Sequence, residues 1–121
     1  MIKLRNIKKS FGPLEVLHGV SLDVAKGEIV SIVGASGAGK STLLQIAGSL
    51  MLPDSGDVVV EGVSLSSLDD GALSMFRNRR IGFIFQDYHL LAEFSAQENV
   101  LMPMLIAGVV RREAGARADE L

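Results

Sequence analysis

The sequence predicts an α/β fold organised around one strand, loop and helix unit. Two observations support this prediction. Residues 29–33 (Ile-Val-Ser-Ile-Val) are mostly β-branched and apolar, which is typical of a strand buried on both faces. A glycine-rich loop follows directly, and the apolar residues of segment 41–50 then recur at helical spacing. A buried strand that leads through glycines into a helix indicates a parallel sheet with helices on both faces, which generally needs more strands than this sequence supplies.

Shorter strands are predicted on either side of this unit. Segments 2–7 and 20–24 alternate apolar and polar residues with a period of two, which indicates half-exposed strands. Residues 26–28 form a turn before the buried strand. After the helix, the cluster Pro-Asp-Ser-Gly at 53–56 predicts another turn, and three valines at 58–60 predict a short strand.

The second half is expected to be mainly helical. Segment 69–80 begins with acidic residues and ends with arginines, an arrangement that favours a helix through its dipole. Segment 81–85 is predicted to be a second buried strand ending at Gln86. Ser95 and Glu98 have the spacing of a capping box before an apolar helix, which we expect to be broken at Pro103 and at Gly108. Segment 111–121 is also predicted to be helical.

Composition excludes several classes of function. The chain has 121 residues, 48% of them hydrophobic and 21% charged, as in an ordinary globular domain. Its net charge of −2 leaves no basic surface for nucleic acid, so no nucleic-acid partner is expected. Absence of cysteine excludes disulfides and thiolate metal sites. The charged N-terminus does not resemble a secretory signal, and the longest apolar stretch, 100–110, is too short to span a membrane.

The loop from Gly34 to Ser41 carries the strongest functional signal. It fits the pattern G-x-x-x-x-G-K-[ST] at every fixed position. Glycines allow successive backbone N–H groups to face phosphate oxygens, and the helix N-terminus adds its own N–H groups and positive dipole end. Lys40 would reach the β- and γ-phosphates, Ser41 would bind Mg²⁺, and Thr42 can add a hydroxyl. The loop therefore predicts a nucleoside triphosphate site, most simply for MgATP.

A plain structural connection would be the alternative for this loop. The pattern arises by chance in about one chain in a few hundred. Its position after a predicted buried strand and before a helix favours the functional interpretation. The histidines, His18 in a strand and His89 in a loop, are expected to have surface or packing roles rather than catalytic ones.

These motifs, in this order, resemble the ATP-binding subunit of an ATP-binding cassette (ABC) transporter. The resemblance covers about residues 4–108 and includes the segments 20–24, 27–28, 32–44 and 52–58, together with Phe85-Gln86, which is similar to the Q-loop of that family. Segments 85–91 and 98–106 look closest to the lipoprotein-releasing subfamily. The macrolide-export and cell-division transporters are near neighbours.

The resemblance implies roles for further residues. Phe11 lies where the family places an aromatic ring that stacks on adenine, although a core residue at a strand end is the alternative. Gln86 would reach Mg²⁺ and the attacking water. The nucleotide would contact Phe11, Gly34, Ala35, Ser36, Gly37, Ala38, Gly39, Lys40, Ser41 and Thr42; Ser41 and Gln86 would bind Mg²⁺; Lys40 and Gln86 would serve catalysis.

The resemblance also implies an incomplete domain and a set of partners. Residues 1–86 would form the nucleotide-binding core with its antiparallel β subdomain, and 87–121 the Q-loop and the start of a helical subdomain. The whole protein would pair with a second ATP-binding subunit and with membrane-spanning subunits, on the cytoplasmic face of a bacterial membrane. The apolar helix at 100–106 would dock on those subunits or pack within its own subdomain; both remain open.

Several motifs of the family do not occur in this sequence. They are the Leu-Ser-Gly-Gly-Gln-type signature loop, the apolar strand with its Asp and catalytic Glu, and the switch histidine. Hydrolysis needs that carboxylate and a facing subunit, so we expect this chain alone to bind nucleotide without appreciable turnover. Another soluble P-loop NTPase, a kinase, or an inert binding module are the alternatives.

Overall fold

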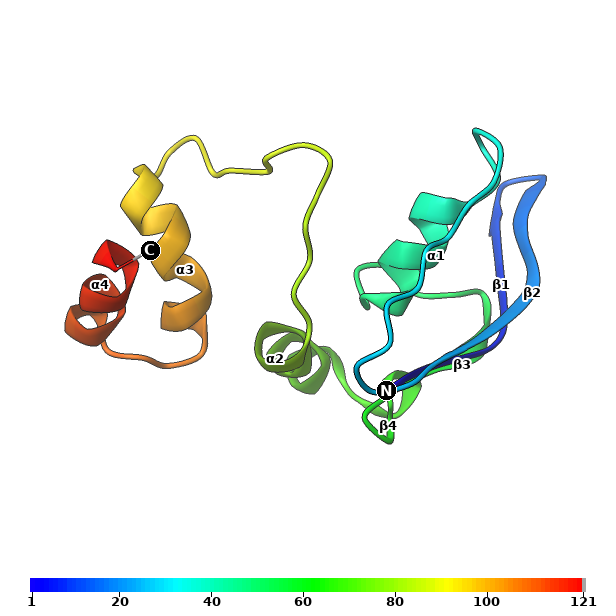
Figure 1. The fold of residues 1–121 in the computed structure, drawn as a ribbon, viewed down its shortest axis with the longest axis horizontal. Coiled ribbons are helices and arrows are strands. Elements are labelled where there is room, and N and C mark those ends of the chain that lie inside the picture. The colour runs from blue at the N-terminus through cyan, green and yellow to red at the C-terminus, as the bar shows by residue number, and fades with distance from the viewer. Residues whose placement is uncertain (121) are drawn as a thin grey trace. The chain divides into compact units, whose positions relative to one another are not determined.

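Two long strands open the chain and pair with each other. In the computed structural model, which describes residues 1–120, β1 (Ile2–Phe11) and β2 (Leu14–Val24) form an antiparallel hairpin. The opposite edge of β1 pairs with β3 (Ser55–Val60), and β3 pairs in turn with the short strand β4 (Val63–Ser64). The result is a four-stranded antiparallel sheet in the order β2-β1-β3-β4 (Figure 1).

The pairing of β1 with β3 requires a glycine at its start. Gly56 has a φ of +96°, and a Cβ atom there would lie 2.5 Å from the carbonyl oxygens of both Arg5 and Asn6. Any other residue would push the two strands apart, because backbone atoms cannot give way as a flexible side chain can. This close approach fixes where β3 enters the sheet.

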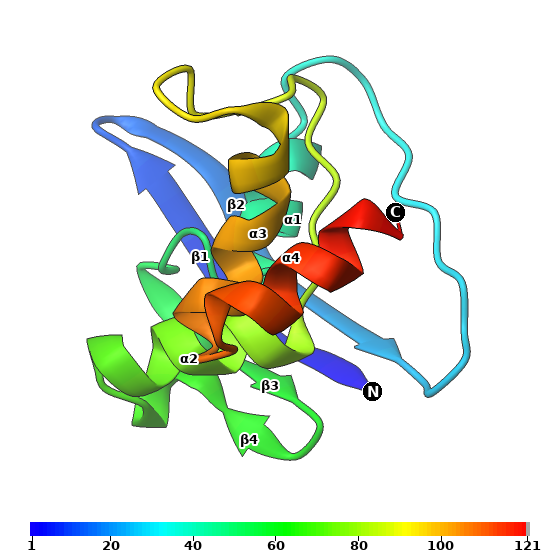
Figure 2. The same cartoon turned by 90° about the vertical axis from the view of Figure 1, so that its left-hand side faces the viewer.

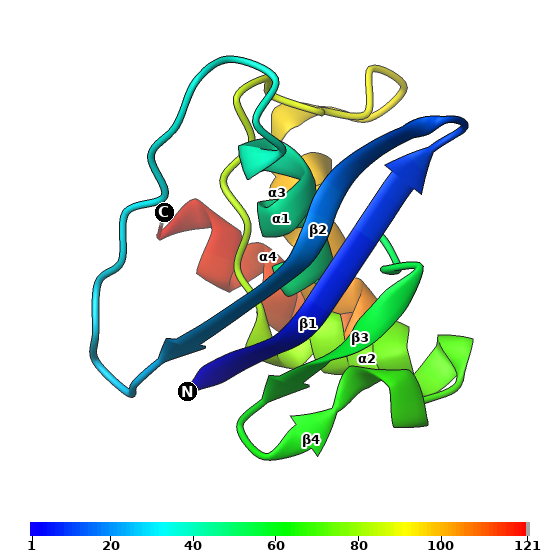
Figure 3. The same cartoon turned by 90° about the vertical axis from the view of Figure 1, so that its right-hand side faces the viewer.

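Helix α1 (Lys40–Ala47) lies over one face of this sheet (Figure 3). It buries Leu43 and Ile46, the latter with no exposed surface. The other buried apolar side chains of this part of the chain come from the sheet, from the 3₁₀ turn η1 (Leu65–Ser67) and from α2: they are Leu4, Ile7, Leu17, Val58, Val60, Leu65 and Leu73. The core therefore sits between α1 and the sheet and anchors the start of that helix.

The chain divides into two compact units, Met1–Leu73 and Ser74–Leu121, and helix α2 (Asp70–Arg80) runs across the division. The start of α2 is capped by Asp69, whose Oδ1 accepts a hydrogen bond of 2.8 Å from the backbone N–H of Ala72. In the second unit, α3 (Ala96–Ile106) and α4 (Arg111–Asp119) pack against each other (Figure 2). Leu101 and Ala114 are the buried apolar residues of this unit within the described part of the chain.

Helix α3 begins with the capping box that the sequence predicts. The backbone N–H of Glu98 donates to Ser95 Oγ at 3.2 Å, and the backbone N–H of Ser95 donates to Glu98 Oε2 at 3.0 Å. The expected break at Pro103 is wrong, because the helix continues through this residue. It ends at Ile106, and Gly108, with a φ of +88°, closes a Schellman motif in which the N–H of Val109 donates to the carbonyl of Met104.

The two predicted central strands do not form. Segments 29–33 and 81–85 belong to no strand, and several of their apolar residues are exposed, such as Ile29 by 95%, Val33 by 87% and Ile84 by 99%. A strand needs a neighbour to bond its backbone groups, and within residues 1–120 neither segment has one. Both segments are apolar, but within residues 1–120 no sheet includes them.

The other predicted elements are confirmed. The strands at 2–7, 20–24 and 58–60 and the helices at 41–50, 69–80 and 111–121 correspond to β1, β2, β3, α1, α2 and α4, with shifted ends. Residue 121 lies outside the described part of the chain. Within that part, no helix combines the length and the apolar character that crossing a membrane requires.

Candidate functional site: a phosphate-binding loop

The predicted phosphate loop forms an open connection into α1. Residues 34–38 are exposed, and the backbone turns at Gly37 and Gly39, whose φ angles are +78° and +81°. These angles lie in the left-handed region, where glycine is favoured because other residues clash. Glycine at these two positions is thus what allows the chain to curl before it enters the helix.

Lys40 folds back over the loop that precedes it. Its ammonium group donates hydrogen bonds to the carbonyl oxygens of Gly34, at 2.9 Å, and Ala35, at 2.6 Å. These contacts place the positive charge of Lys40 beside the beginning of the loop. A cation held there gives the loop the charge that a phosphate group requires.

The N-terminus of α1 has no side-chain cap. Its N-cap residue is Gly39, which has no side chain to accept a hydrogen bond, and no acidic residue lies in the first turn. The first N–H groups of a helix have no partner within the helix, so here they remain available to a ligand. Together with the helix dipole, they favour an anion at this point.

A hollow lies beside this helix start. It is lined by Gly37, Gly39, Lys40, Ser41 and Thr42 of the loop and helix, and by Val16 of β2. The structure thus brings five of the predicted nucleotide-binding residues around one space. Ser41 is exposed there and Thr42 is half-buried, so both hydroxyls are within the hollow's lining.

Sequence reasoning missed Val16. Lys9 pairs with Leu17 and Ser10 with Glu15, which makes Val16 the extra residue of a β-bulge in β2. A Cβ atom on Gly39 would lie 2.8 Å from Val16 Cγ1. No short pattern marks Val16, because only the packing of the loop on the sheet brings it to the site.

Phe11 lies at the end of β1, next to the hairpin turn. Its side chain is 47% exposed, which argues against the alternative of a core residue. The Lys9 ammonium lies over the ring, 5.8 Å from its centroid. The hairpin end that carries Phe11 and the N-terminus of α1 face the same end of this unit (Figure 3). Phe11 thus lies at this hairpin end with enough exposed surface to stack on a flat group.

Gln86 and the two histidines are not among the residues that line this hollow. Gln86 is exposed, lies in an irregular segment of the second unit, and does not end a strand. His18, in β2, pairs with Glu15 at 3.2 Å and is mostly exposed. His89 stacks on Phe85, with ring centroids 4.5 Å apart. Both histidines have surface contacts of the kind that the sequence predicts.

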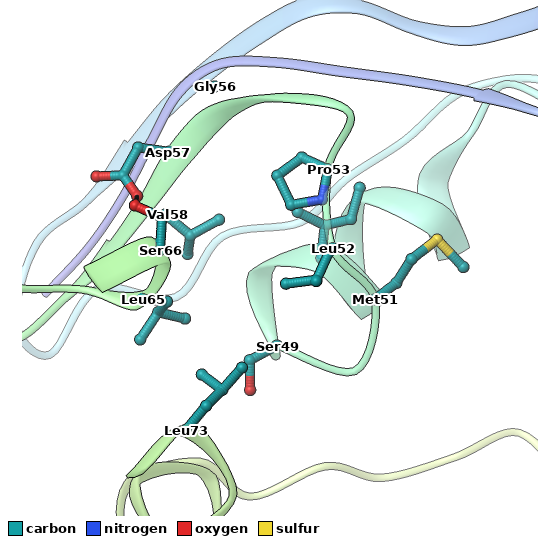
Figure 4. A pocket seen from close by; sticks show the side chains of 11 residues that line it. Ser49, Met51, Leu52, Pro53, Gly56, Asp57, Val58, Leu65, Ser66 and Leu73 are labelled. Carbon is teal, nitrogen blue, oxygen red and sulfur yellow. Dashed lines mark hydrogen bonds between the residues drawn. The ribbon is translucent and has the colours of Figure 1, made fainter. Parts of the chain in front are cut away.

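A second pocket in the first unit differs in character (Figure 4). It lies between the end of α1, β3, η1 and the start of α2, and its lining comprises Ile46, Ser49, Met51, Leu52, Pro53, Gly56, Asp57, Val58, Leu65, Ser66 and Leu73. It contains no cationic side chain, and its one charged group is the carboxylate of Asp57. An anionic ligand would be repelled there, whereas the hollow at the start of α1 is lined by the cationic side chain of Lys40.

The fold and the loop together define an α/β domain of the phosphate-loop class, in which α1 packs on an antiparallel sheet. The model of the ABC transporter family matches residues 17–121. The chain belongs to this family, as its motifs predict.

Similar proteins indicate the subfamily to which the chain is related. The chain is 57% identical over its whole length to the lipoprotein-releasing system ATP-binding protein LolD of Bacteroides thetaiotaomicron, and 54% identical to those of Bacteroides fragilis and Porphyromonas gingivalis. The resemblance to the lipoprotein-releasing subfamily is confirmed. The chain spans little more than half of these proteins, namely 55–56% of their length.

Solved structures confirm the fold class. A bacterial ABC transporter cassette in a dimeric structure superposes with a TM-score of 0.90 at 38% identity, over 99% of this chain and 55% of that chain. A dimeric ATP-binding cassette in a post-hydrolysis state, bound to ADP and Pi, gives a TM-score of 0.89 at the same identity and coverage. The chain therefore has the fold of the first half of such a cassette.

Proposed function

We propose that this chain binds MgATP at the loop from Gly34 to Ser41, as part of the ATP-binding subunit of a transporter that releases lipoproteins from a membrane. The observation that carries the proposal is the open N-terminus of α1, with the ammonium of Lys40 held beside it. Both features favour a bound anion, and neither is balanced by an acidic side chain in the first turn.

Each part of the loop has a role in this proposal. Backbone N–H groups of residues 34–39 surround the phosphate oxygens, Lys40 contacts the β- and γ-phosphates, and Thr42 adds a hydroxyl. Phe11 stacks on the adenine ring from its exposed position.

Mg²⁺ would be held by the Ser41 hydroxyl and the phosphates, with Gln86 contributing its side-chain oxygen. Within residues 1–120, no group of three or more His, Asp or Glu side chains could hold a metal ion. The two donors Ser41 and Gln86 suit Mg²⁺, because that ion usually takes few protein ligands and completes its shell with phosphate oxygens and water.

The partners follow from the family. The relatives are named for a lipoprotein-releasing system, and the matching solved cassettes are dimeric. In a protein of the relatives' length, we propose pairing with a second ATP-binding subunit and docking on membrane-spanning subunits from the cytoplasmic side. Val100 and Ile106 of α3 are exposed, whereas Leu101 is buried. Leu101 thus packs within this unit, whereas Val100 and Ile106 offer apolar surface for docking.

The binding experiment is a titration of the chain with ATP and ADP, with and without Mg²⁺. We expect binding in the micromolar to millimolar range, and Lys40→Ala should weaken it by at least about tenfold, because a charge-assisted contact to phosphate is lost. Lys26→Ala is the matched control, since Lys26 lies in an exposed turn. Absence of any binding would instead support an inert module.

Hydrolysis is tested separately. The sequence contains neither the family's signature loop nor its catalytic Glu. We therefore expect no appreciable release of phosphate from ATP by this chain alone. A steady turnover that Lys40→Ala abolishes would contradict this expectation.

A further inference from the structure

The aromatic end of β1 is held by a carboxylate that is distant in the sequence. Asp54 follows α1 in the turn that leads to β3. Its Oδ1 accepts a hydrogen bond of 2.8 Å from Lys9 Nζ, and its Oδ2 accepts one of 2.7 Å from the backbone N–H of Ser10. Its own backbone N–H donates to the carbonyl of Lys8 at 2.9 Å. Three consecutive residues of β1, directly before Phe11, are thus bonded to one aspartate.

The ion pair also determines what surrounds the ring of Phe11. The side chain of Lys9 is only 17% exposed, and its ammonium lies over the ring, 5.8 Å from the centroid. A cation held over an aromatic face is attracted by the ring's negative quadrupole, so the pair favours one orientation of the ring. The ammonium lies over one face, and Phe11 is still 47% exposed, so ring surface remains for a second flat group.

Asp54 is also connected to the phosphate loop through α1. That helix ends in a Schellman motif, in which the N–H of Ser49 donates to the carbonyl of Ile46 and the N–H of Leu50 to that of Gln45. The chain reaches Asp54 four residues after Leu50. The same short segment therefore links the helix that starts at the phosphate loop with the strand end that carries Phe11.

We propose that Asp54 and Lys9 are positioning residues for base recognition: they hold the ring of Phe11 with one face covered by the Lys9 ammonium and the other presented to the nucleotide base. This inference rests on the proposed nucleotide site and goes beyond it, because neither residue touches the phosphates. Asp54 suits the role because its contacts with Lys9 and with the Ser10 N–H lower the pKa of its carboxyl, which keeps the ion pair intact at neutral pH.

The test compares a ligand that has a base with one that does not. MgATP and magnesium tripolyphosphate are titrated against the chain and against Asp54→Ala and Lys9→Met. Losing an ordered ring should weaken ATP binding by about 3- to 10-fold in each variant, the range expected of a partly exposed cation–π and ion-pair contact. Tripolyphosphate binding should change by less than about twofold, since its contacts lie in the loop.

Asp23→Ala is the matched control. Asp23 forms an ion pair of 2.7 Å with Arg5 in the same hairpin, away from Phe11, so its loss should alter neither ligand's affinity. Phe11→Trp gives a second measurement, because the chain has no other tryptophan. In that background, Asp54→Ala should shift the emission maximum and reduce its quenching by ATP, and circular dichroism should report an unchanged fold.

The outcomes separate the two proposals. Selective loss of ATP affinity in Asp54→Ala and Lys9→Met supports the positioning role. An unchanged ATP affinity, or an equal loss for ATP and tripolyphosphate, overturns it while leaving the nucleotide site in place. If the unmodified chain binds neither ligand, both proposals fail. If Asp54→Ala misfolds, Lys9→Met decides between these outcomes. It keeps Asp54 and the hydrogen bond from the Ser10 N–H to its carboxylate.

Discussion

Helices α3 and α1 begin in opposite ways. At the start of α3, Ser95 and Glu98 exchange hydrogen bonds with the free backbone groups, so the helix satisfies its own end. At the start of α1, Gly39 offers no side chain, and the first N–H groups are left open beside Lys40. A closed end contributes stability, whereas an open end is available for an anion. The contrast distinguishes a helix start that is capped by its own side chains from one whose N–H groups are open to the ligand that we propose.

The largest effect is expected where the open start packs on the sheet. A Cβ atom in Gly39→Ala would lie 2.8 Å from Val16 Cγ1 and 2.9 Å from Leu17 Cδ2, at a φ of +81°. Strain and overpacking together should lower the free energy of unfolding by about 2–4 kcal/mol. Urea denaturation followed by circular dichroism measures it.

Gly37→Ala is the control for this substitution. Gly37 has nearly the same φ, +78°, but nothing lies within 4 Å of the added carbon. Only the backbone strain remains, about 1–2 kcal/mol. Equal losses in the two variants would show that the packing of Gly39 on β2 contributes nothing to stability.

A smaller effect is expected at the closed start. Ser95→Ala removes the side-chain half of the capping box and should lower the free energy of unfolding by about 1 kcal/mol. Ser41→Ala, in the first turn of α1, should change it by less than about 0.5 kcal/mol, because an exposed hydroxyl away from a cap rarely contributes more. The same denaturation experiment tests both. A larger loss of unfolding free energy in Ser41→Ala than in Ser95→Ala would contradict the contrast between the two helix starts.

The smallest effect concerns acid sensitivity. The backbone N–H and the hydroxyl of Ser95, followed by Arg111, lower the pKa of Glu98 in the folded chain. A carboxyl with a lowered pKa stabilises the fold above its unfolded pKa, and this contribution disappears as the pH falls through the folded pKa. Ser95→Ala removes the hydroxyl contact, so its stability should fall less steeply in acid than that of the unmodified chain. Parallel slopes between neutral pH and pH about 3 would contradict this linkage.

Short-range signals explain what could be predicted from the sequence. The capping box at Ser95, the glycine-rich loop and the alternation in β1 and β2 are patterns within a few residues, and each forms the expected structure. Segments 29–33 and 81–85 carry an equally strong local signal, yet they form no strand. A strand forms only when a second segment pairs with it, and the local pattern of one segment does not show whether a partner is present.

The parts of the site that depend on tertiary packing could likewise not be predicted from the sequence. Val16 reaches the hollow through a β-bulge, and Asp54 reaches the end of β1 across more than forty residues of sequence. Neither has a neighbour in the sequence that marks it. At Pro103 the local signal is misleading instead. Proline predicts a break, yet the helix continues, and the N–H of Ala107 donates to the Pro103 carbonyl.

The position of Lys40 has a consequence for the entropy of binding. A free lysine side chain loses about 2 kcal/mol of rotamer freedom when it is fixed. Here the bonds to the carbonyls of Gly34 and Ala35 restrict Lys40 while the chain is without a ligand. Much of that loss therefore accompanies folding rather than binding, and an arriving phosphate meets a cation that is already ordered.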